Sequence, residues 1–168
     1  MARYVVASVT EILPGERKLV TVRGRPIVIF NLDGEYFGIL DRCPHQGASL
    51  CKGRLVGLVD APRPGEYSFC RKGEIIRCPW HGWEFDIRTG KSRCEPESIK
   101  ATQYDVGVKR GSEVIDESYE AETFDVVVES DYVVVNEKAL YDAGNSVDFN
   151  LHRSEETNLV IKILELLI

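Results

Sequence analysis

The chain has 168 residues, of which 43% are hydrophobic and 29% are charged. These proportions exclude a disordered chain and a membrane-embedded one, and the length favours a single domain with an appended tail. The 27 acidic residues outnumber the 21 basic ones and give a formal net charge of −6. This charge argues against nonspecific nucleic-acid binding, because such binding depends on a basic surface.

The first residues, MARYVVASVTEILPGER, show no charged region followed by a long apolar run and a small-residue cleavage site. The sequence therefore predicts a cytoplasmic protein. In that compartment the five cysteines are expected to bind metal, to react or to remain free thiols. The strongly apolar stretch at 159–168 is half as long as the ~20 residues of a spanning helix, so no membrane association is expected.

Short runs rich in Val, Ile, Tyr and Phe alternate with Gly, Pro and Asp-Gly signals and predict β-strands. The predicted strands in chain order are YVVASV (4–9), KLVTV (18–22), PIVIFNL (26–32), EYFGIL (35–40), RLVGLV (54–59), EIIRC (74–78), YDVGV (104–108), FDVVVE (124–129) and YVVVN (132–136). Asp33 and Gly34 predict a two-residue hairpin turn, because a type I′ turn requires positive φ at both central positions. An all-β fold, an antiparallel sandwich or small barrel, is expected.

Two segments depart from the strand pattern. Residues 109–123 are polar and acidic and are predicted to form a surface excursion. The tail from residue 139 predicts a short C-terminal helix, because Ser154 can cap it and Leu159 and Ile163 share one face. Such an apolar helix should be buried against the β domain or against a second subunit, and the second case would make the tail an oligomer contact.

The residues that carry chemistry form two short motifs, Cys43-Pro44-His45 and Cys78-Pro79-Trp80-His81. The chain has three histidines, and two of them follow a cysteine within three residues. Each motif places one thiolate and one imidazole on a tight turn, where a proline restricts the backbone and a glycine follows the histidine. Because a predicted strand leads into each motif, the two turns can face each other and enclose a metal.

Two kinds of metal site fit these four side chains. Two thiolates and two imidazoles can hold a structural zinc ion in a closed tetrahedron, which would make the protein a zinc-stabilised interaction module. Zinc fingers usually take their cysteines from one motif and their histidines from another, whereas here each turn supplies one of each. The mixed turns favour a 2Fe-2S cluster in which one iron takes both thiolates and the other takes both imidazoles.

The segments CPHQGASL (43–50) and CPWHGWEFD (78–86) resemble the paired cluster-binding loops of the Rieske family. The second loop is most similar to those of the ferredoxins and oxygenase domains of aromatic-ring-hydroxylating dioxygenases. The resemblance implies a Rieske 2Fe-2S domain, an antiparallel β sandwich with a small two-loop subdomain, over residues 1–138, followed by the tail at 139–168. It also implies the ligands of one cluster, namely Cys43 and Cys78 on an inner iron and His45 and His81 on an outer, more exposed iron.

The loops depart from those of respiratory Rieske proteins. Ala48 and Trp80 stand where those proteins have two further cysteines that form a disulfide, and Trp83 and Phe85 stand where hydroxyl groups lie near the sulfurs. Fewer hydrogen bonds to sulfur leave the reduced cluster less stabilised. We therefore expect a reduction potential at the low end of the Rieske range, about −150 mV.

The segment between the loops, 50–77, is longer than in most relatives and is expected to form an extended hairpin. Its cysteines Cys51 and Cys70 could form a pair, but they are expected, like Cys94, to be free thiols. His152 lies in the tail and is expected at the surface. With only this histidine uncommitted, the two histidines and carboxylate of a mononuclear oxygen-activating iron are not available.

The sequence thus predicts an electron-transfer protein that carries one electron at a time from a flavin reductase to an oxygenase, and not an enzyme in its own right. A Rieske subunit built into an oxygenase complex is the related alternative. A regulatory redox sensor would use the same cluster, although the acidic charge argues against direct DNA binding.

Overall fold

The computed structural model describes residues 3–116, 120–121 and 130–136. The predicted strand at 124–129 and the predicted C-terminal helix lie outside the described residues, and the domain boundary after residue 138 stays a prediction. The elements in chain order are β1 (Arg3–Ser8), the 3₁₀ helix η1 (Val9–Glu11), β2 (Arg17–Val22), β3 (Arg25–Leu32), β4 (Glu35–Leu40), β5 (Arg54–Arg63), β6 (Glu66–Arg77), β7 (Glu84–Asp86), β8 (Gln103–Arg110), α1 (Gly111–Asp116), β9 (Glu120–Ala121) and β10 (Asp131–Asn136).

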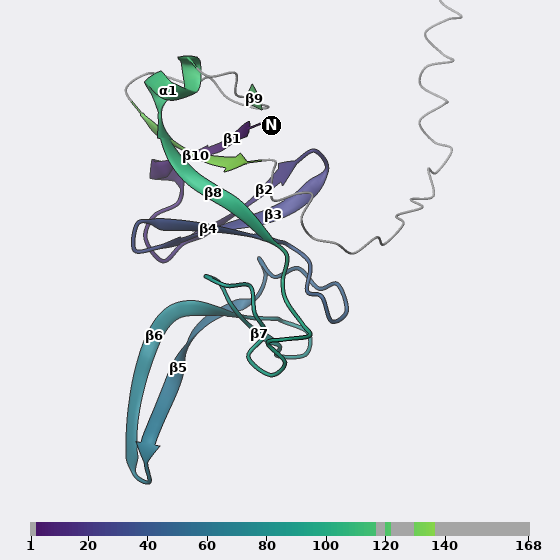
Figure 1. Ribbon diagram of the computed structural model, residues 1–168, viewed down its shortest axis with the longest axis vertical. Helices are drawn as coiled ribbons and strands as arrows, with labels where there is room; N and C mark the ends of the chain where they lie inside the picture. The colour runs from purple at the N-terminus through teal and green to yellow at the C-terminus, as the bar shows by residue number, and fades with distance from the viewer. Residues whose placement is uncertain (1–2, 117–119, 122–129, 137–168) are drawn as a thin grey trace, which may run out of the picture.

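Two sheets, almost entirely antiparallel, make up the described part of the molecule (Figure 1). The main sheet has seven strands in the order β2-β3-β4-β8-β10-β1-β9, and the smaller sheet has three in the order β5-β6-β7. The short pairing of β1 with β9 is parallel, and the other described pairings are antiparallel. The all-β prediction is confirmed, and every predicted strand within the described residues is present.

The turn between β3 and β4 has the predicted geometry. Asp33 and Gly34 have φ values of 53° and 94°, and Leu32 pairs with Glu35 across the turn. The Gly34 N–H also donates to the side-chain oxygen of Asn31 at 2.7 Å, which anchors the turn to the preceding strand. The local requirement for positive φ was therefore a sufficient signal for this hairpin.

Strand β3 lies between two hydrophobic cores. This position explains why its sequence is apolar without alternation. Ile27 and Ile29 face the core of the main sheet, whereas Val28 and Phe30 face the core beneath the two loops. Strands buried on both faces lose the alternation that marks a half-exposed strand. The second core is the one that supports the site, and it contains residues of β3, β4, β6, β7 and both loops.

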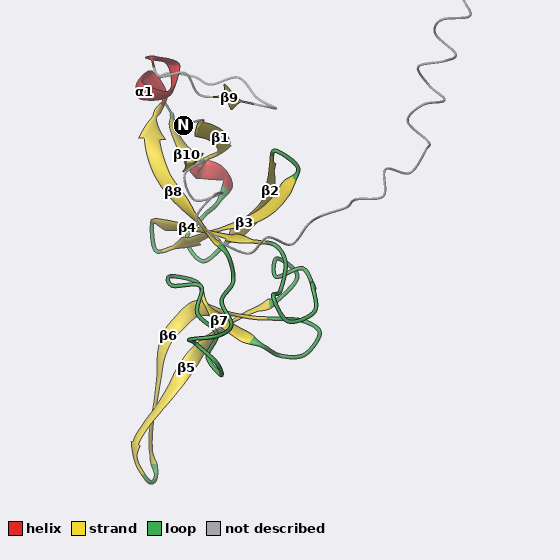
Figure 2. Ribbon diagram, turned by 45° about the vertical axis from the view of Figure 1, so that its right-hand side comes forward, coloured by secondary structure: helices red, strands yellow, loops and turns green. Residues whose placement is uncertain are grey.

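The segment between the loops forms the predicted extended hairpin, made of β5 and β6, which projects away from the main sheet (Figure 2). Strand β6 begins at Glu66, well before the predicted start at residue 74. Pro64 and Gly65 form the hairpin turn, with Gly65 at φ 86°, as a type II turn requires. We call residues 57–71 of this hairpin the arm.

The segment predicted as a surface excursion contains an element that the sequence analysis missed. Strand β8 continues to Arg110, and the helix α1 follows directly. Val114 is buried in a small cluster with Val5, Tyr132 and Val134, so this side chain attaches the helix to the sheet. A helix of six residues is too short to show a 3.6-residue periodicity. No helix in the described part of the chain is long and apolar enough to span a membrane.

Candidate metal centre

The first loop joins β4 to β5 and begins with a tight turn at Cys43. The Cys43 N–H donates to the carbonyl oxygen of Ala48 at 2.8 Å, and the Gly47 N–H donates back to the Cys43 carbonyl oxygen at 2.8 Å. These two bonds close a compact ring of backbone around His45. The turn holds the cysteine at the inner end of the loop and the histidine at its outer end.

The second loop joins β6 to β7 and repeats this arrangement. The Cys78 N–H donates to the Trp83 carbonyl oxygen at 2.7 Å, and the Gly82 N–H donates to the Cys78 carbonyl oxygen at 3.1 Å. In both loops the cysteine therefore bonds to the fifth residue after it and to the glycine at the fourth. The two loops thus present their cysteines and histidines from equivalent turns.

The glycine of each turn is required by the backbone. Gly47 and Gly82 have φ values of 81° and 70°, in the left-handed region that other residues rarely adopt. Gly47 lies two residues after His45, and Gly82 directly follows His81. A residue with a side chain at either glycine position would be strained and would displace the neighbouring histidine.

Gly82→Ala is expected to lower the free energy of unfolding by about 1–2 kcal/mol, because an L side chain is strained at this φ. The melting temperature should fall by about 2–8 °C in a chain of this size. Gly107→Ala is the matched control, since Gly107 in β8 has ordinary φ and open space at its Cβ position. Equal melting temperatures for the two variants would show that the loop tolerates the side chain.

The two cysteines form a pair in the interior. Cys43 and Cys78 are each 2% exposed and belong to the core beneath the loops. Burial raises the pKa of the Cys43 thiol, the backbone N–H groups of His45 and Gln46 counteract this, and the adjacent Cys78 thiol raises it further. A metal bound by both sulfurs would replace their protons, and the backbone N–H groups would then donate to a thiolate.

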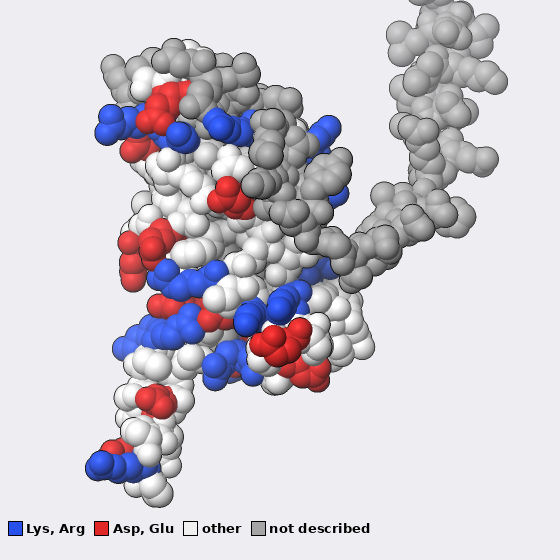
Figure 3. Space-filling model, viewed as in Figure 1, with Lys and Arg blue, Asp and Glu red and all other residues white. Residues whose placement is uncertain are grey.

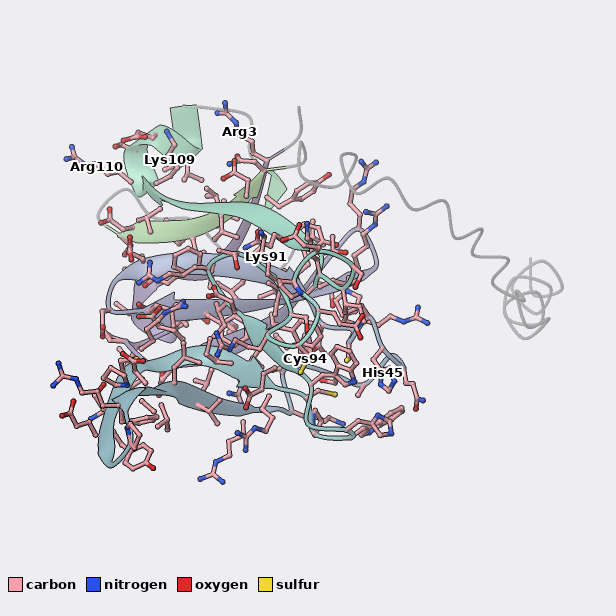
Figure 4. The ribbon with its side chains drawn as sticks, turned by 60° about the horizontal axis from the view of Figure 1, so that its bottom comes forward. Arg3, His45, Lys91, Cys94, Lys109 and Arg110 are labelled. Carbon is pink, nitrogen blue, oxygen red and sulfur yellow. The ribbon has the colours of Figure 1, made fainter. Side chains whose placement is uncertain are left out.

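The two histidines form a second pair at the surface. His45 and His81 are exposed, and their ring centroids lie 5.0 Å apart with the planes at 89°. Figure 4 shows His45 at the periphery of the molecule, on the side of the loops. The structure therefore brings the predicted ligands together as two pairs on equivalent turns, with the thiols inside and the imidazoles outside.

Two tryptophans lie next to the imidazoles and differ in their surroundings. The Trp83 ring lies 5.2 Å from His45 and stacks at 6.5 Å on Phe85, which is fully buried. Trp80 lies 6.3 Å from His81 and is 63% exposed. Trp83 thus packs the histidine loop against the core, whereas Trp80 leaves an aromatic surface beside the site.

Asp41 supports the first loop and was not predicted. Its carboxylate is nearly buried and accepts hydrogen bonds from the Ser49 hydroxyl at 2.8 Å and from the Cys51 N–H at 2.5 Å. Arg17 of β2 then donates to the carbonyl oxygens of Cys51 and Gly53 at 2.8 and 2.7 Å. These bonds join the two ends of the loop and attach its exit to the main sheet. No local pattern indicates them, because Arg17 and Gly53 are far apart in sequence.

Asp41→Asn is expected to destabilise the protein by about 1–3 kcal/mol and to accelerate loss of the bound metal, because a single amide oxygen cannot replace both carboxylate oxygens. One of the two donors, Ser49 or Cys51, would be left without an acceptor. Asp105→Asn is the matched control, since Asp105 is exposed on β8 and a change there is expected within about 0.5 kcal/mol. Thermal unfolding and metal-release rates that match between the variants would contradict a supporting role for Asp41.

The remaining cysteines agree with the expected free thiols. Cys51 is half-buried and Cys70 and Cys94 are exposed, and none of them forms a disulfide. Within residues 3–116, 120–121 and 130–136, no group of three or more His, Cys, Asp or Glu side chains is placed to hold a single metal ion. His152 lies outside the described residues.

Comparison with known proteins decides the family. The model of the Rieske [2Fe-2S] domain matches residues 2–105, more than half of the chain. The chain belongs to the Rieske family. The biphenyl dioxygenase ferredoxin subunit of Pseudomonas sp. (strain KKS102) is 31% identical over 109 residues, which cover 65% of this chain and 86% of that protein. The 3-phenylpropionate/cinnamic acid dioxygenase ferredoxin subunit of Photorhabdus laumondii is 32% identical over 112 residues, or 67% and 91% of the two chains.

Solved structures from carbazole 1,9a-dioxygenase have the same fold. The ferredoxin of carbazole 1,9a-dioxygenase from Nocardioides aromaticivorans matches with a TM-score of 0.51 and 20% identity, over 79% of this chain and 97% of that chain. A complex of reduced oxygenase and oxidized ferredoxin in carbazole 1,9a-dioxygenase contains a chain that matches with a TM-score of 0.50 and 21% identity, over 78% of this Rieske chain and 91% of that one. The family and fold implied by the two loops are confirmed.

Proposed function

We propose that this Rieske protein holds one 2Fe-2S cluster on Cys43, His45, Cys78 and His81 and uses it to carry single electrons. The observation that supports this proposal is the division of the four side chains into a buried thiol pair and an exposed imidazole pair. A Rieske cluster takes two cysteines on one iron and two histidines on the other and exchanges one electron at a time. The donor set therefore fits the group for which the family is named.

The placement of the two pairs supports a role in electron transfer between proteins. Imidazole edges at the surface give a partner a short route to the site, while Cys43 and Cys78 lie in the core, away from water. The backbone N–H groups of His45 and Gln46 donate hydrogen bonds to the Cys43 sulfur. Hydrogen bonds of this kind stabilise a more negative cluster and so raise its reduction potential.

The relatives support a place for this chain in a dioxygenase system. The proteins that match over most of their own length carry the names of dioxygenase ferredoxin subunits. We therefore propose that the chain accepts electrons from a flavin reductase and delivers them to an oxygenase, and that the oxidation of the substrate takes place on the oxygenase. Trp80, exposed beside His81, offers an apolar contact for either partner.

Low-temperature electron paramagnetic resonance of the dithionite-reduced protein, with iron and acid-labile sulfide counted per chain, tests the proposal. We expect a rhombic signal with an average g value below that of an all-cysteine cluster, together with two irons and two sulfides per chain. A protein purified without oxygen that holds zinc and no sulfide would contradict the electron-carrier function. Copurification with a larger oxygenase subunit would instead identify a permanent subunit.

A further inference from the structure

The arm carries an exposed apolar face. Val59 of β5 pairs directly with Phe69 of β6, and Tyr67 lies two residues before Phe69, so the three side chains share one face of the hairpin. Val59 is 68% exposed, Phe69 55% and Tyr67 73%. Figure 3 shows that much of the visible surface of the arm is uncharged. Contiguous exposed apolar residues of this kind mark interaction surfaces.

The arm is also an incomplete sheet. Strand β7 pairs with β6 only at Ile75–Arg77, so within the described residues no strand covers the outer edge of β6 at Glu66–Cys70. A two-stranded hairpin in water is marginally stable, and a third and fourth strand would add main-chain hydrogen bonds along its length. The open edge of β6 is therefore suited to pairing with another strand.

The two edges of the arm are not equally open. The β5 edge carries Asp60 and Pro62, and proline lacks the N–H that a new strand would need. The β6 edge from Glu66 to Cys70 contains no proline, and its only charged residue is Glu66 at the tip end. Strand β6 runs on to Arg77, but its regular extended conformation is interrupted at Arg71, where φ is 49°. A partner strand would therefore add to β6.

The charges of this edge are complementary to those of a second, antiparallel copy of it. Glu66 begins this edge of β6, and the basic residues Arg71 and Lys72 follow Cys70 at its other end. Arg71 is engaged by Glu74 and Asp86, whereas Lys72 lies exposed above the Phe69 ring, 5.4 Å from its centroid. An antiparallel pairing places the Glu66 end of one copy beside the Lys72 end of the other, twice by symmetry, while a parallel pairing would place like charges together.

We propose that two copies of this protein associate through their arms, by antiparallel pairing of β6 at residues 66–70 about a two-fold axis near Ser68. In this arrangement Tyr67 of each copy stands opposite Phe69 of the other, and the two hairpins become one four-stranded sheet. The contact is isologous, because each copy contributes the same surface. The histidine loops lie beside the base of the arm and remain free to meet a redox partner (Figure 2).

Sedimentation velocity of the full-length, cluster-loaded protein tests the association. We expect a dimer at micromolar concentration, and a monomer for Tyr67→Glu combined with Phe69→Glu, which would place like charges in the interface. Leu13→Glu combined with Leu19→Glu is the matched control, since these residues are 54% and 47% exposed outside the arm. A monomeric parent protein, or a dimer that survives the arm variant, would overturn the proposal and in the second case would indicate another interface.

A charge exchange tests the direction of pairing. Glu66→Lys and Lys72→Glu are each expected to raise the dimer dissociation constant about tenfold at low salt, and the double variant should restore it. Arg63 lies 3.7 Å from Glu66, but both side chains are mostly exposed, so the loss of that ion pair has little effect. If the double variant did not recover the dissociation constant of the parent dimer, this result would contradict antiparallel pairing.

A disulfide between copies tests the position of the axis. Cα atoms of directly opposite residues in an antiparallel pair are about 4.5–5.5 Å apart, within the range that a disulfide spans. In a background with Cys70→Ser and Cys94→Ser, Ser68→Cys is expected to give a covalent dimer under mild oxidation. Asp60→Cys in the same background is the control, because Asp60 pairs with Ser68 from the β5 side and should stay monomeric on a denaturing gel. A covalent dimer of Asp60→Cys with a monomeric Ser68→Cys would overturn the assignment of the contact to the β6 edge.

Discussion

His45→Ala and His81→Ala are each expected to abolish the assembled cluster, with iron and sulfide per chain falling to background. Each change removes one of two nitrogen donors from the outer iron, and no other histidine lies within the described residues to replace it. Both imidazoles are exposed, so the fold should remain and the free energy of unfolding of the protein without cluster should change by about 0.5 kcal/mol or less.

His152→Ala is the control for these two variants, because it removes the remaining histidine of the chain. It should retain full iron and sulfide and the same visible absorption. Circular dichroism of His45→Ala and His81→Ala should retain the β spectrum, which separates loss of a ligand from loss of the fold. Full iron and sulfide in His45→Ala would show that the proposed ligand set is wrong.

Leu50→Ala is expected to destabilise the protein strongly while leaving every proposed ligand in place. Leu50 ends the first loop, is fully buried, and lies in one core cluster with Cys43 and Cys78. Its truncation should cost about 2–5 kcal/mol and lower the melting temperature by about 5–15 °C. Because the cavity lies beneath the first loop, we also expect the cluster to be lost at a lower temperature than in the parent protein.

Leu13→Ala makes the same substitution at a side chain that is 54% exposed. Its melting temperature should stay within about 2 °C of the parent value, because surface truncations change stability by about 0.5 kcal/mol. Absorption of the cluster and far-ultraviolet circular dichroism, followed in the same heating experiment, separate release of the cluster from unfolding. Equal shifts for Leu50→Ala and Leu13→Ala would contradict the assignment of Leu50 to the supporting core.

The expected low reduction potential stays a prediction. The side chains of Trp83 and Phe85 carry no hydroxyl group, and Phe85 is fully buried beneath the ring of Trp83. The described donors near the Cys43 sulfur are backbone N–H groups, which any sequence would supply in this turn. Potentiometric titration measures whether these donors alone leave the potential near the low end of the Rieske range.

Much of the fold and the whole candidate ligand set could be predicted from local sequence. The turn at Asp33 and Gly34 requires positive φ, which short-range sterics encode in two residues. Cys43-Pro44-His45 and Cys78-Pro79-Trp80-His81 likewise contain the four proposed ligands, and the glycine after each histidine is the residue that the observed φ needs. These features depend on neighbours within about five residues, so the sequence by itself determined them.

Only the tertiary structure decided which distant residues support the site and which surfaces stay open. The hydrogen bonds of Arg17 to the exit of the first loop and the burial of Val114 of α1 join segments that no sequence pattern connects. The free edge of β6 also depends on where β7 stops pairing. These features arise when β-sheets pack and pair across long sequence separations, and that packing selects among contacts that local propensity leaves equally possible.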